Sequence, residues 1–329
     1  MADVDAVVLH TPGQPPEVRT VPQPVGGELT IRVAAAPIVP LDLLCASGTS
    51  YFGVPATPYV PGVQGVGHVL SGSLPRGTPV WFATAAGMAP GDGSMRAIAT
   101  AAERDVVPLS DGADLAHVAA AGLSAVAAWM ALTWRGGLVE GEQVLVLGAG
   151  GVVGQSAVQL ARAAGARRVV AVAREGAGAA RAERARPDAL VTLGAGDDVT
   201  ALAQRISAAC HGPLDLVLDP VYGLPAAAAA RALRPRGRLV NLGGSAVESS
   251  PLDSSTLRSR SLQILGYTNN ELTPDQRREA LLRVVQEIVA GRLLVDHERV
   301  PLRDATDAWT RQRAGDTDGR IVLIPEGAA

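Results

Sequence analysis

A short apolar run followed by closely spaced glycines constrains the fold of this chain more than any other stretch. Val144–Leu147 carries the branched residues of a strand buried on both faces. The glycines that follow are Gly148, Gly150, Gly151 and Gly154. Apolar residues then recur at helical spacing up to Gly165. A strand, a glycine turn and a helix in this order predict a diphosphate site, because bare backbone and a helix N-terminus favour an anion.

The prediction includes the first helical residues, Val152 and Val153, whose amides are expected to face the diphosphate. The spacing departs from G-x-G-x-x-G, because the third glycine lies one place further on. The alternative is an ordinary glycine-rich turn of an α/β protein. The neighbouring strand and helix favour the nucleotide interpretation.

The second predicted strand, Arg168–Arg174, indicates which nucleotide would bind. An NAD site usually has Asp or Glu at the end of this strand, whereas this chain has Ala173 followed by Arg174. Guanidinium pairs with a 2′-phosphate, and Arg181 and Arg184 lie on the next predicted helix. The sequence therefore predicts NADPH, with Arg174 as its main contact. The alternative is that Arg174 is a solvated surface arginine.

Further cofactor contacts are expected at the carboxyl ends of later strands, where ligands of parallel sheets bind. The residues concerned are Asp219, Asn241, Leu242, Gly243, Gly244, Tyr267, Thr268 and Asn269. Backbone groups there are predicted to fix the nicotinamide amide. The alternative for the asparagines is a turn residue that satisfies local backbone.

The rest of the 329-residue chain predicts about two domains. Short strand-like runs with Pro/Gly turns fill residues 1–112, and strands alternate with helices over 113–269. All 29 basic residues are arginine, which excludes Schiff-base chemistry on lysine. Cys45 and Cys210 match no metal or redox spacing. The apolar window from His117 to Leu132 is interpreted as a buried helix rather than a membrane span.

Several motifs together resemble the zinc-independent medium-chain dehydrogenase/reductases, close to the quinone oxidoreductases. They are Pro40–Asp42 with Ser47-Gly48, Pro58–Gly67, Ala120–Trp129, Val144–Gly154, Asp215–Gly223, Gly237–Gly244 and Gly319–Pro325. The resemblance implies an α/β protein with a GroES-like β-barrel domain and an inserted Rossmann-type, doubly wound parallel sheet. The GroES-like domain would comprise 1–112 and 270–329, and the Rossmann domain 113–269. The resemblance also implies NADPH-dependent reduction of a quinone or an activated C=C, and assembly as a homodimer.

Departures from the family's zinc enzymes argue against a metal. Gly62-Val63-Gln64 stands where those relatives have Gly-His-Glu, and their first cysteine ligand and four-cysteine loop are missing. No metal is therefore expected. Val39 replaces an asparagine common in quinone reductases, and Leu193 replaces a phosphate-binding tyrosine of one relative.

Three residues are candidates for catalysis. Tyr51 occupies a loop position where the family often has an active-site tyrosine, and its phenol could stabilise and protonate an enolate. Gln64, at the former ligand position, could hydrogen-bond to substrate or nicotinamide. Asp42 could orient the loop or cap a turn. The alternative for Tyr51 is a loop residue whose ring only packs.

Three functions stay open at this point. The first is an NADPH-dependent reductase of quinones or α,β-unsaturated carbonyls. The second is a biosynthetic tailoring enzyme that acts on a polyketide-like intermediate, either with or without net oxidation or reduction of that intermediate. The third is a non-catalytic NADPH-binding sensor. A small-molecule partner, no nucleic acid or membrane and a cytoplasmic location are expected, because the net charge is −3 and no secretory signal is recognised.

Overall fold

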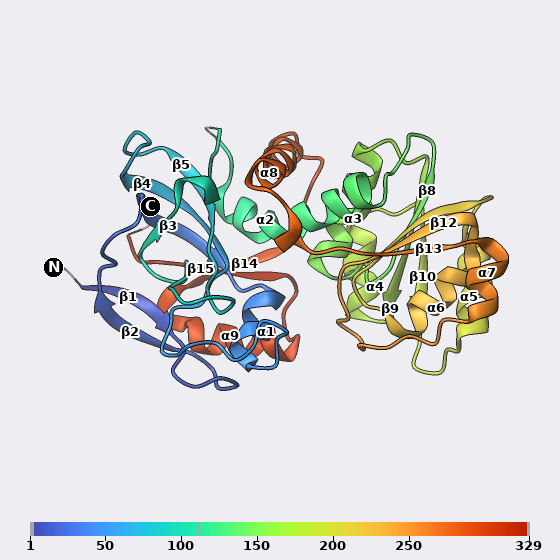
Figure 1. Ribbon diagram of the computed structural model, residues 1–329, viewed down its shortest axis with the longest axis horizontal. Helices are drawn as coiled ribbons and strands as arrows, with labels where there is room; N and C mark the ends of the chain where they lie inside the picture. Colours follow the sequence, from blue (N-terminus) through green and yellow to red (C-terminus); the bar gives the residue numbers. More distant parts are fainter. Residues whose placement is uncertain (1–2, 111, 328–329) are drawn as a thin grey trace. The chain divides into compact units, whose positions relative to one another are not determined.

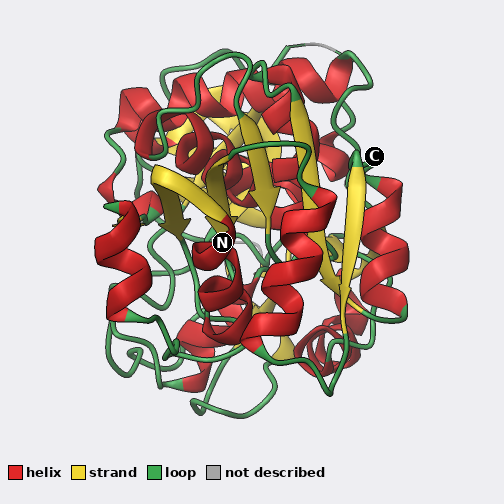
Figure 2. Cartoon of the chain, turned by 90° about the vertical axis from the view of Figure 1, so that its right-hand side faces the viewer, coloured by secondary structure: helices red, strands yellow, loops and turns green. Residues whose placement is uncertain are grey.

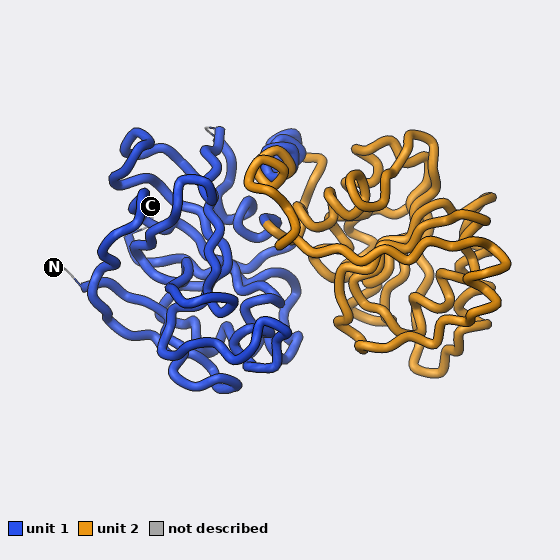
Figure 3. The backbone as a smooth tube through the Cα atoms, in the orientation of Figure 1, with its two compact units in different colours: residues 1–122, 281–290, 295–329 blue, residues 123–280, 291–294 orange. Residues whose placement is uncertain are grey.

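The computed structural model describes residues 3–110 and 112–327, and the chain divides into two compact units (Figure 3). Unit 1 comprises residues 1–122, 281–290 and 295–329, and unit 2 comprises 123–280 and 291–294. The sequence predicts domain boundaries after residues 112 and 269, whereas the compact units change after residues 122 and 280. The predicted limits of the functional domains stay a prediction.

Unit 2 is built on a six-stranded parallel sheet with the order β10-β9-β8-β11-β12-β13. The strands are β8 (Gln143–Val146), β9 (Arg168–Arg174), β10 (Ala189–Leu193), β11 (Leu214–Asp219), β12 (Leu233–Asn241) and β13 (Gln263–Gly266). Counted along the chain this is the order 3-2-1-4-5-6, and it reverses between β8 and β11. The predicted Rossmann-type doubly wound sheet is confirmed. Ligands of such sheets bind at the point of reversal.

Helices lie on both sides of this sheet (Figures 1 and 2). They are α3 (Val152–Ala163), α4 (Ala177–Arg184), α5 (Val199–Ala209), α6 (Gly223–Ala232) and α7 (Ser254–Arg260). The strands are apolar on both faces because both faces are covered: β8 is buried along its whole length. Short side chains of α6 pack closely, with Ala226 to Ala230 buried. The core of this unit is therefore built mainly from Val, Leu, Ile and Ala side chains, since the chain has few aromatic residues.

Unit 1 holds a seven-stranded sheet with the order β14-β15-β3-β4-β5-β7, with β6 paired to β3, and a separate β1–β2 hairpin. The strands are β1 (Asp3–Val8), β2 (Glu17–Pro22), β3 (Leu29–Pro37), β4 (Gln64–Ser71), β5 (Pro79–Ala83), β6 (Ile98–Ala101), β7 (Val106–Pro108), β14 (His297–Pro301) and β15 (Arg320–Ile324). Helix α9 (Ala305–Ala314) buries Trp309 in the core of this unit. The C-terminal strand β15 pairs with β3, so the end of the chain completes the N-terminal sheet as predicted.

The sequence predicted only β structure before residue 113, and this was wrong at α1 (Pro40–Ser47). Pro40 begins the helix, where its missing N–H costs nothing, and Gly48 ends it with a φ of 76°. The hairpin strand β2 was also missed, because no residue of β2 is buried and its pattern does not alternate. Strong local end signals did mark α1, but eight residues are too few for a clear helical period.

Helix α2 (Leu115–Met130) is broken at Gly122, whose φ of 25° and ψ of −126° are not helical. Five residues of π-helix, Ala131–Arg135, continue it. The segment Leu115–Arg135 is long and apolar enough to cross a membrane by length and composition. However, 72% of its most apolar window is buried inside the protein. This burial agrees with the prediction of a buried core helix. Such a helix can be as long and as apolar as a membrane-spanning one.

The glycine at the start of α3 gives the first testable prediction. A Cβ on Gly154 would lie 2.4 Å from the carbonyl oxygen of Gly148, whereas a Cβ on Gly151 would lie 3.6 Å from its nearest neighbour. Gly154→Ala should therefore lower the free energy of unfolding by about 2–3 kcal/mol. The matched variant Gly151→Ala should change it by less than about 1 kcal/mol. Urea denaturation measures both, and equal stabilities would contradict the packing argument.

Candidate functional site

The glycine turn lies between β8 and α3, at the point where the sheet order reverses. Gly148 has a φ of 60°, which favours glycine, and a Cβ there would lie 2.5 Å from Cγ1 of Val221. A Cβ on Gly150 would lie 2.5 Å from the carbonyl oxygen of Gly178. The turn is therefore packed against the loop after β11 on one side and against α4 on the other. Side chains at Gly148 and Gly150 would not fit.

The N-terminus of α3 is open in a way that suits an anion. Gly151 is the N-cap residue, with extended backbone and no side chain to cap the helix. The amides of Val152 and Val153 begin the helix, where N–H groups have no intrahelical acceptor. A Cβ on Gly151 would meet only the carbonyl oxygen of Gly148, at an ordinary contact distance. These features fit the predicted diphosphate, which would be held by backbone N–H groups and the helix dipole.

The carboxyl end of β9 carries the predicted adenosine contacts. Ala173 is buried with 4% exposure, and Arg174 is exposed at the last strand position. Glu175 follows, and its carboxylate oxygen lies 3.2 Å from where a Cβ of Gly194 would be. An exposed guanidinium without a carboxylate at the Ala173 position fits a phosphorylated ribose better than an unmodified one.

Arg181 contacts the glycine turn, a contact that the sequence did not predict. Its Nε donates a hydrogen bond of 3.0 Å to the carbonyl oxygen of Gly150. Nε2 of the buried Gln155 donates to the same oxygen at 3.1 Å. Sequence spacing placed Arg181 on the correct helix, but only the packing of α4 on the turn brings it to Gly150.

The ends of β11 and β12 are fastened together by Asp219 and Asn241. Asp219 is fully buried, and its Oδ1 accepts from the amides of Val221 at 3.1 Å and Tyr222 at 2.8 Å. Nδ2 of Asn241 donates to Oδ2 of Asp219 at 3.1 Å and to the Gly243 carbonyl at 3.0 Å. Burial raises the pKa of Asp219. The bond from Asn241 to the Gly243 carbonyl matches the alternative weighed for the asparagines, a turn residue that satisfies local backbone, and the bond to Asp219 joins two strands.

Backbone amides after β12 stay available for a ligand. Leu242 donates its amide to the carbonyl of Asp219 at 2.9 Å. Within residues 3–110 and 112–327, the amides of Gly243 and Gly244 donate no hydrogen bond to the chain. Both glycines lie directly after a parallel strand, so these N–H groups fit the predicted contact with a nicotinamide amide.

Asn269 uses its side chain inside unit 2. The Tyr267 hydroxyl donates to Oδ1 of Asn269 at 2.7 Å, and Nδ2 of Asn269 donates to the Leu123 carbonyl of α2 at 3.0 Å. Burial raises the pKa of Tyr267. Thr268 caps a short 3₁₀ turn by accepting from the Asn270 amide. The cofactor roles of Tyr267, Thr268 and Asn269 stay predictions, and the contacts seen hold the loop to α2.

The first catalytic candidate, Asp42, is almost fully buried in unit 1 at the start of α1. Its Oδ2 accepts from the Val39 amide at 2.8 Å and its Oδ1 from the Val63 amide at 2.9 Å. Burial raises its pKa from 3.8 to about 6, against the lowering effect of these amides and of the buried Arg320. The contacts are those of a helix cap that ties α1 to β4, the structural role weighed from the sequence.

The second candidate, Gln64, has no exposed surface. Its Oε1 accepts a 2.9 Å hydrogen bond from Nε1 of Trp81, and its Nε2 donates to the Ala119 carbonyl at 3.5 Å. The break of α2 at Gly122 lies against it, since a Cβ on Gly122 would come within 2.0 Å of Oε1. Its role toward substrate stays a prediction. The contacts seen make Gln64 a support for the broken helix.

The third candidate, Tyr51, is 77% exposed on the loop after α1. Its ring lies 4.3 Å from that of Phe52, centroid to centroid. Leu44 and Val54 of the same region are also exposed apolar residues. The phenol is accessible to solvent, and its role as proton donor stays a prediction.

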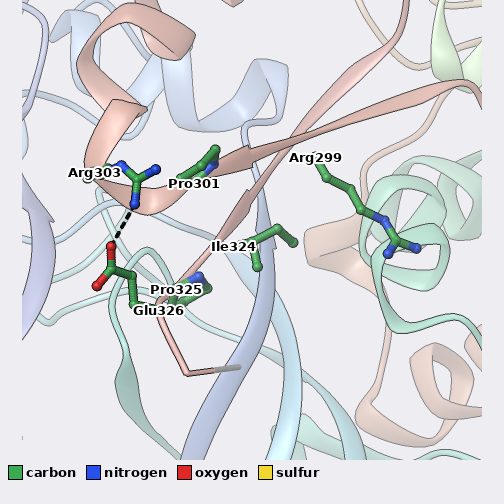
Figure 4. A pocket seen from close by; sticks show the side chains of 6 residues that line it. All are labelled: Arg299, Pro301, Arg303, Ile324, Pro325 and Glu326. Carbon is green, nitrogen blue, oxygen red and sulfur yellow. Dashed lines mark hydrogen bonds and ion pairs between the residues drawn. The ribbon is translucent and has the colours of Figure 1, made fainter. Parts of the chain in front are cut away.

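Other polar clusters lie outside these positions. His117 and His297 stack with centroids 5.5 Å apart, although they are 180 positions apart in sequence and no motif linked them. A hollow of about 390 Å³ is lined by Arg299, Pro301, Arg303, Ile324, Pro325 and Glu326 (Figure 4). Arg303 pairs with Glu326 at its rim. No group of three or more His, Cys, Asp or Glu side chains placed for a metal occurs among the described residues.

Comparisons with known proteins show which sequences and folds this chain resembles. A protein-family model described as a zinc-binding dehydrogenase matches residues 152–287. The structure of a mycobacterial quinone oxidoreductase superposes with a TM-score of 0.86 at 23% identity, covering 98% of this chain and 100% of that one. A mycobacterial protein complexed with NADPH gives 0.84 at 23% identity, over 98% and 100%. At this identity the two solved structures show that the chain shares their fold.

Two curated proteins are similar to this chain in sequence. Quinone oxidoreductase of Pongo abelii is 34% identical over 150 residues, which is 44% of each chain. A phenolphthiocerol/phthiocerol polyketide synthase protein of Mycobacterium tuberculosis is 29% identical over 315 residues. The match covers 92% of this chain and only 14% of that protein. The chain therefore corresponds to a small part of the polyketide synthase.

The buried carboxyl of Asp42 gives a pH-dependent prediction. Its folded-state pKa of about 6 lies above the ordinary 3.8, so the folded chain binds this proton more tightly. Its contribution to the free energy of unfolding is therefore largest near pH 4 and falls as the pH rises through about 6. A shift of about two units corresponds to about 3 kcal/mol.

Asp42→Asn removes this titration. The difference in unfolding free energy, native chain minus variant, should fall by up to about 3 kcal/mol from about pH 4 to about pH 7. Urea denaturation across this range measures it. A difference that is constant, or that grows with pH, would show that the Asp42 proton is not bound more tightly in the folded state.

Proposed function

We propose that the protein is an NADPH-dependent, zinc-free reductase of a quinone or an α,β-unsaturated carbonyl. The observation that carries the proposal is the open glycine turn at the sheet's point of reversal, with Arg174 exposed at the end of the next strand and Ala173 in place of a carboxylate. That arrangement suits a diphosphate and a 2′-phosphate in one ligand.

The cofactor, when bound, would supply a hydride to the substrate. The residues of this chain would do the rest. The amides of Val152 and Val153 would hold the diphosphate, and those of Gly243 and Gly244 would orient the nicotinamide amide. Tyr51 would donate a proton to the oxygen on which negative charge develops. Reduction of a C=C or quinone then balances, with one hydride and one proton added.

The comparisons support the assignment as a reductase. A quinone oxidoreductase is among the sequence relatives, and a solved structure of similar fold contains NADPH. The absence of zinc is proposed from the chain's own residues, since Val63 and Gln64 replace the usual ligand types and Gln64 is engaged with Trp81. A cytoplasmic homodimer completes the proposal, and sedimentation would give the oligomeric state.

The direct experiment is a binding titration followed by an activity panel. Fluorescence titration with NADPH and NADH should show tighter binding of NADPH, and consumption of NADPH should follow addition of quinones or enones. A chain that binds neither nucleotide, or that clearly prefers NADH, would overturn the proposal. Metal analysis of the purified active protein should find no stoichiometric zinc.

The second candidate function is a tailoring step on a polyketide-like intermediate. It is favoured by the match of nearly the whole chain to part of a polyketide synthase. Thioester-linked enoyl substrates should then be turned over better than free quinones. Turnover of such a substrate without NADPH consumption would identify a redox-neutral version, and NADPH binding without any activity would identify a sensor.

Arg174 is expected to determine the nucleotide preference. Arg174→Gln removes the guanidinium but keeps a polar side chain at an exposed position, so folding should be unaffected. Kd for NADPH should rise by about tenfold, because a charge-assisted contact to phosphate is lost, while Kd for NADH should stay within about twofold. An equal loss for both nucleotides would place Arg174 away from the 2′-phosphate.

Tyr51 is expected to affect chemistry and not nucleotide binding. Tyr51→Phe should lower kcat by about tenfold or more if the phenol donates the proton. Kd for NADPH should stay unchanged, since Tyr51 is not among the proposed nucleotide contacts. An unchanged kcat would assign the residue to packing alone.

A further inference from the structure

The peptide between Gly150 and Gly151 is fixed by three hydrogen bonds. The Gly151 amide donates to the Gly148 carbonyl at 3.0 Å. On the opposite side of the same peptide plane, the Gly150 carbonyl accepts from Gln155 at 3.1 Å and from Arg181 at 3.0 Å. One donor comes from α3 and the other from α4.

This peptide would otherwise be free to turn over. Neither Gly150 nor Gly151 has a Cβ, and glycine adopts positive and negative φ about equally well. A planar peptide that rotates as a unit would exchange the directions of its carbonyl and its amide. Turning over would break the bond from the Gly151 amide and direct the Gly150 carbonyl oxygen at that of Gly148, which is repulsive. Holding the Gly150 carbonyl therefore preserves the shape of the turn that precedes the amides of Val152 and Val153.

We propose that Arg181 and Gln155 are positioning residues for the diphosphate turn, and that they act by holding the Gly150 carbonyl. The assignment rests on the proposed nucleotide-binding function and adds residues to it. Because Arg181 donates through Nε to a backbone oxygen, its effect is on a part of the site that NADPH and NADH share. This separates it from Arg174, whose effect is on the 2′-phosphate alone.

The packing of the turn agrees with this assignment. Gln155 is 3% exposed and belongs to α3, so its amide is held in place by the helix that also presents Val152 and Val153. The backbone of Gly178, at the start of α4, lies so close to Gly150 that a Cβ on Gly150 would be 2.5 Å from its oxygen. Arg181 lies one helical turn further along α4. The turn is thus pre-arranged before a ligand arrives, which lowers the entropy lost on binding.

The test measures Kd for both nucleotides by fluorescence on the full chain. Arg181→Gln and Gln155→Met should each raise Kd for NADPH and for NADH by about threefold, because one donor to Gly150 remains. The double variant should raise both by about fiftyfold, more than the product of the single effects, since the two donors share one acceptor. The Tm of each single variant should stay close to that of the native chain.

The matched control is Arg184→Gln, which removes the same charge from the last turn of the same helix. It should leave Kd for NADH unchanged. A loss confined to NADPH in Arg181→Gln would overturn the assignment and make Arg181 a phosphate contact. Strictly multiplicative effects in the double variant would also overturn it. A native chain that binds neither nucleotide would remove the proposed function, and this assignment with it.

Discussion

The close approach of backbone to backbone at the start of α3 is the constraint on which unit 2 depends. Gly154 lies so near the Gly148–Ala149 segment that a Cβ would be 2.4 Å from one atom and 2.6 Å from another. This contact lets the short glycine turn join β8 to α3, so that the helix N-terminus is at the sheet's point of reversal. The proposed diphosphate site therefore depends on backbone packing, whereas the proposed 2′-phosphate contact depends on the Arg174 side chain.

Most polar side chains around this site are engaged with the chain itself. Asp219 and Asn241 fasten two strand ends, and Asn269 fastens a loop to α2. A buried polar group that is already hydrogen-bonded holds its loop rigidly, whereas exchanging that bond for a ligand would gain little. The proposed nucleotide contacts are therefore main-chain N–H groups and arginine side chains. A chain whose basic residues are all arginine can use the planar guanidinium for both phosphate and carbonyl contacts.

Unit 1 contains a different kind of constraint, a buried carboxyl and a buried guanidinium. Burial raises the pKa of Asp42 to about 6 and lowers that of Arg320 to about 10. The cost of burial is offset by amides that donate to Asp42 and by the Ile38 carbonyl that accepts from Arg320. These bonds join α1, β4 and β15, so that residues from both ends of the sequence specify one arrangement. Each buried charged group is thus hydrogen-bonded to the backbone of a segment that is distant in sequence or next to its own helix.

The sequence by itself determined the parallel sheet, the glycine turn and the position of the predicted residues at the ends of β11, β12 and β13. Those features depend on local patterns. Branched apolar runs, glycine spacing and helical periodicity can all be recognised within a segment of about 25 residues. It also marked Arg174, because a strand end has a defined place in such a sheet. It did not reveal α1, whose eight residues are too short for a period.

Only the tertiary structure decided what Gln64, Asn241 and Arg181 touch. The Gln64 side chain lies against Gly122, at the break in α2, although the two residues are 58 positions apart in sequence. This close approach is possible because Gly122 has no Cβ. Arg181 meets Gly150 because α4 packs on the turn, and Asn241 meets Asp219 because β12 pairs with β11. A side chain's hydrogen-bond partner is set by which elements become neighbours in space. Sequence spacing contains that information only within one element or one turn, and these contacts cross between elements.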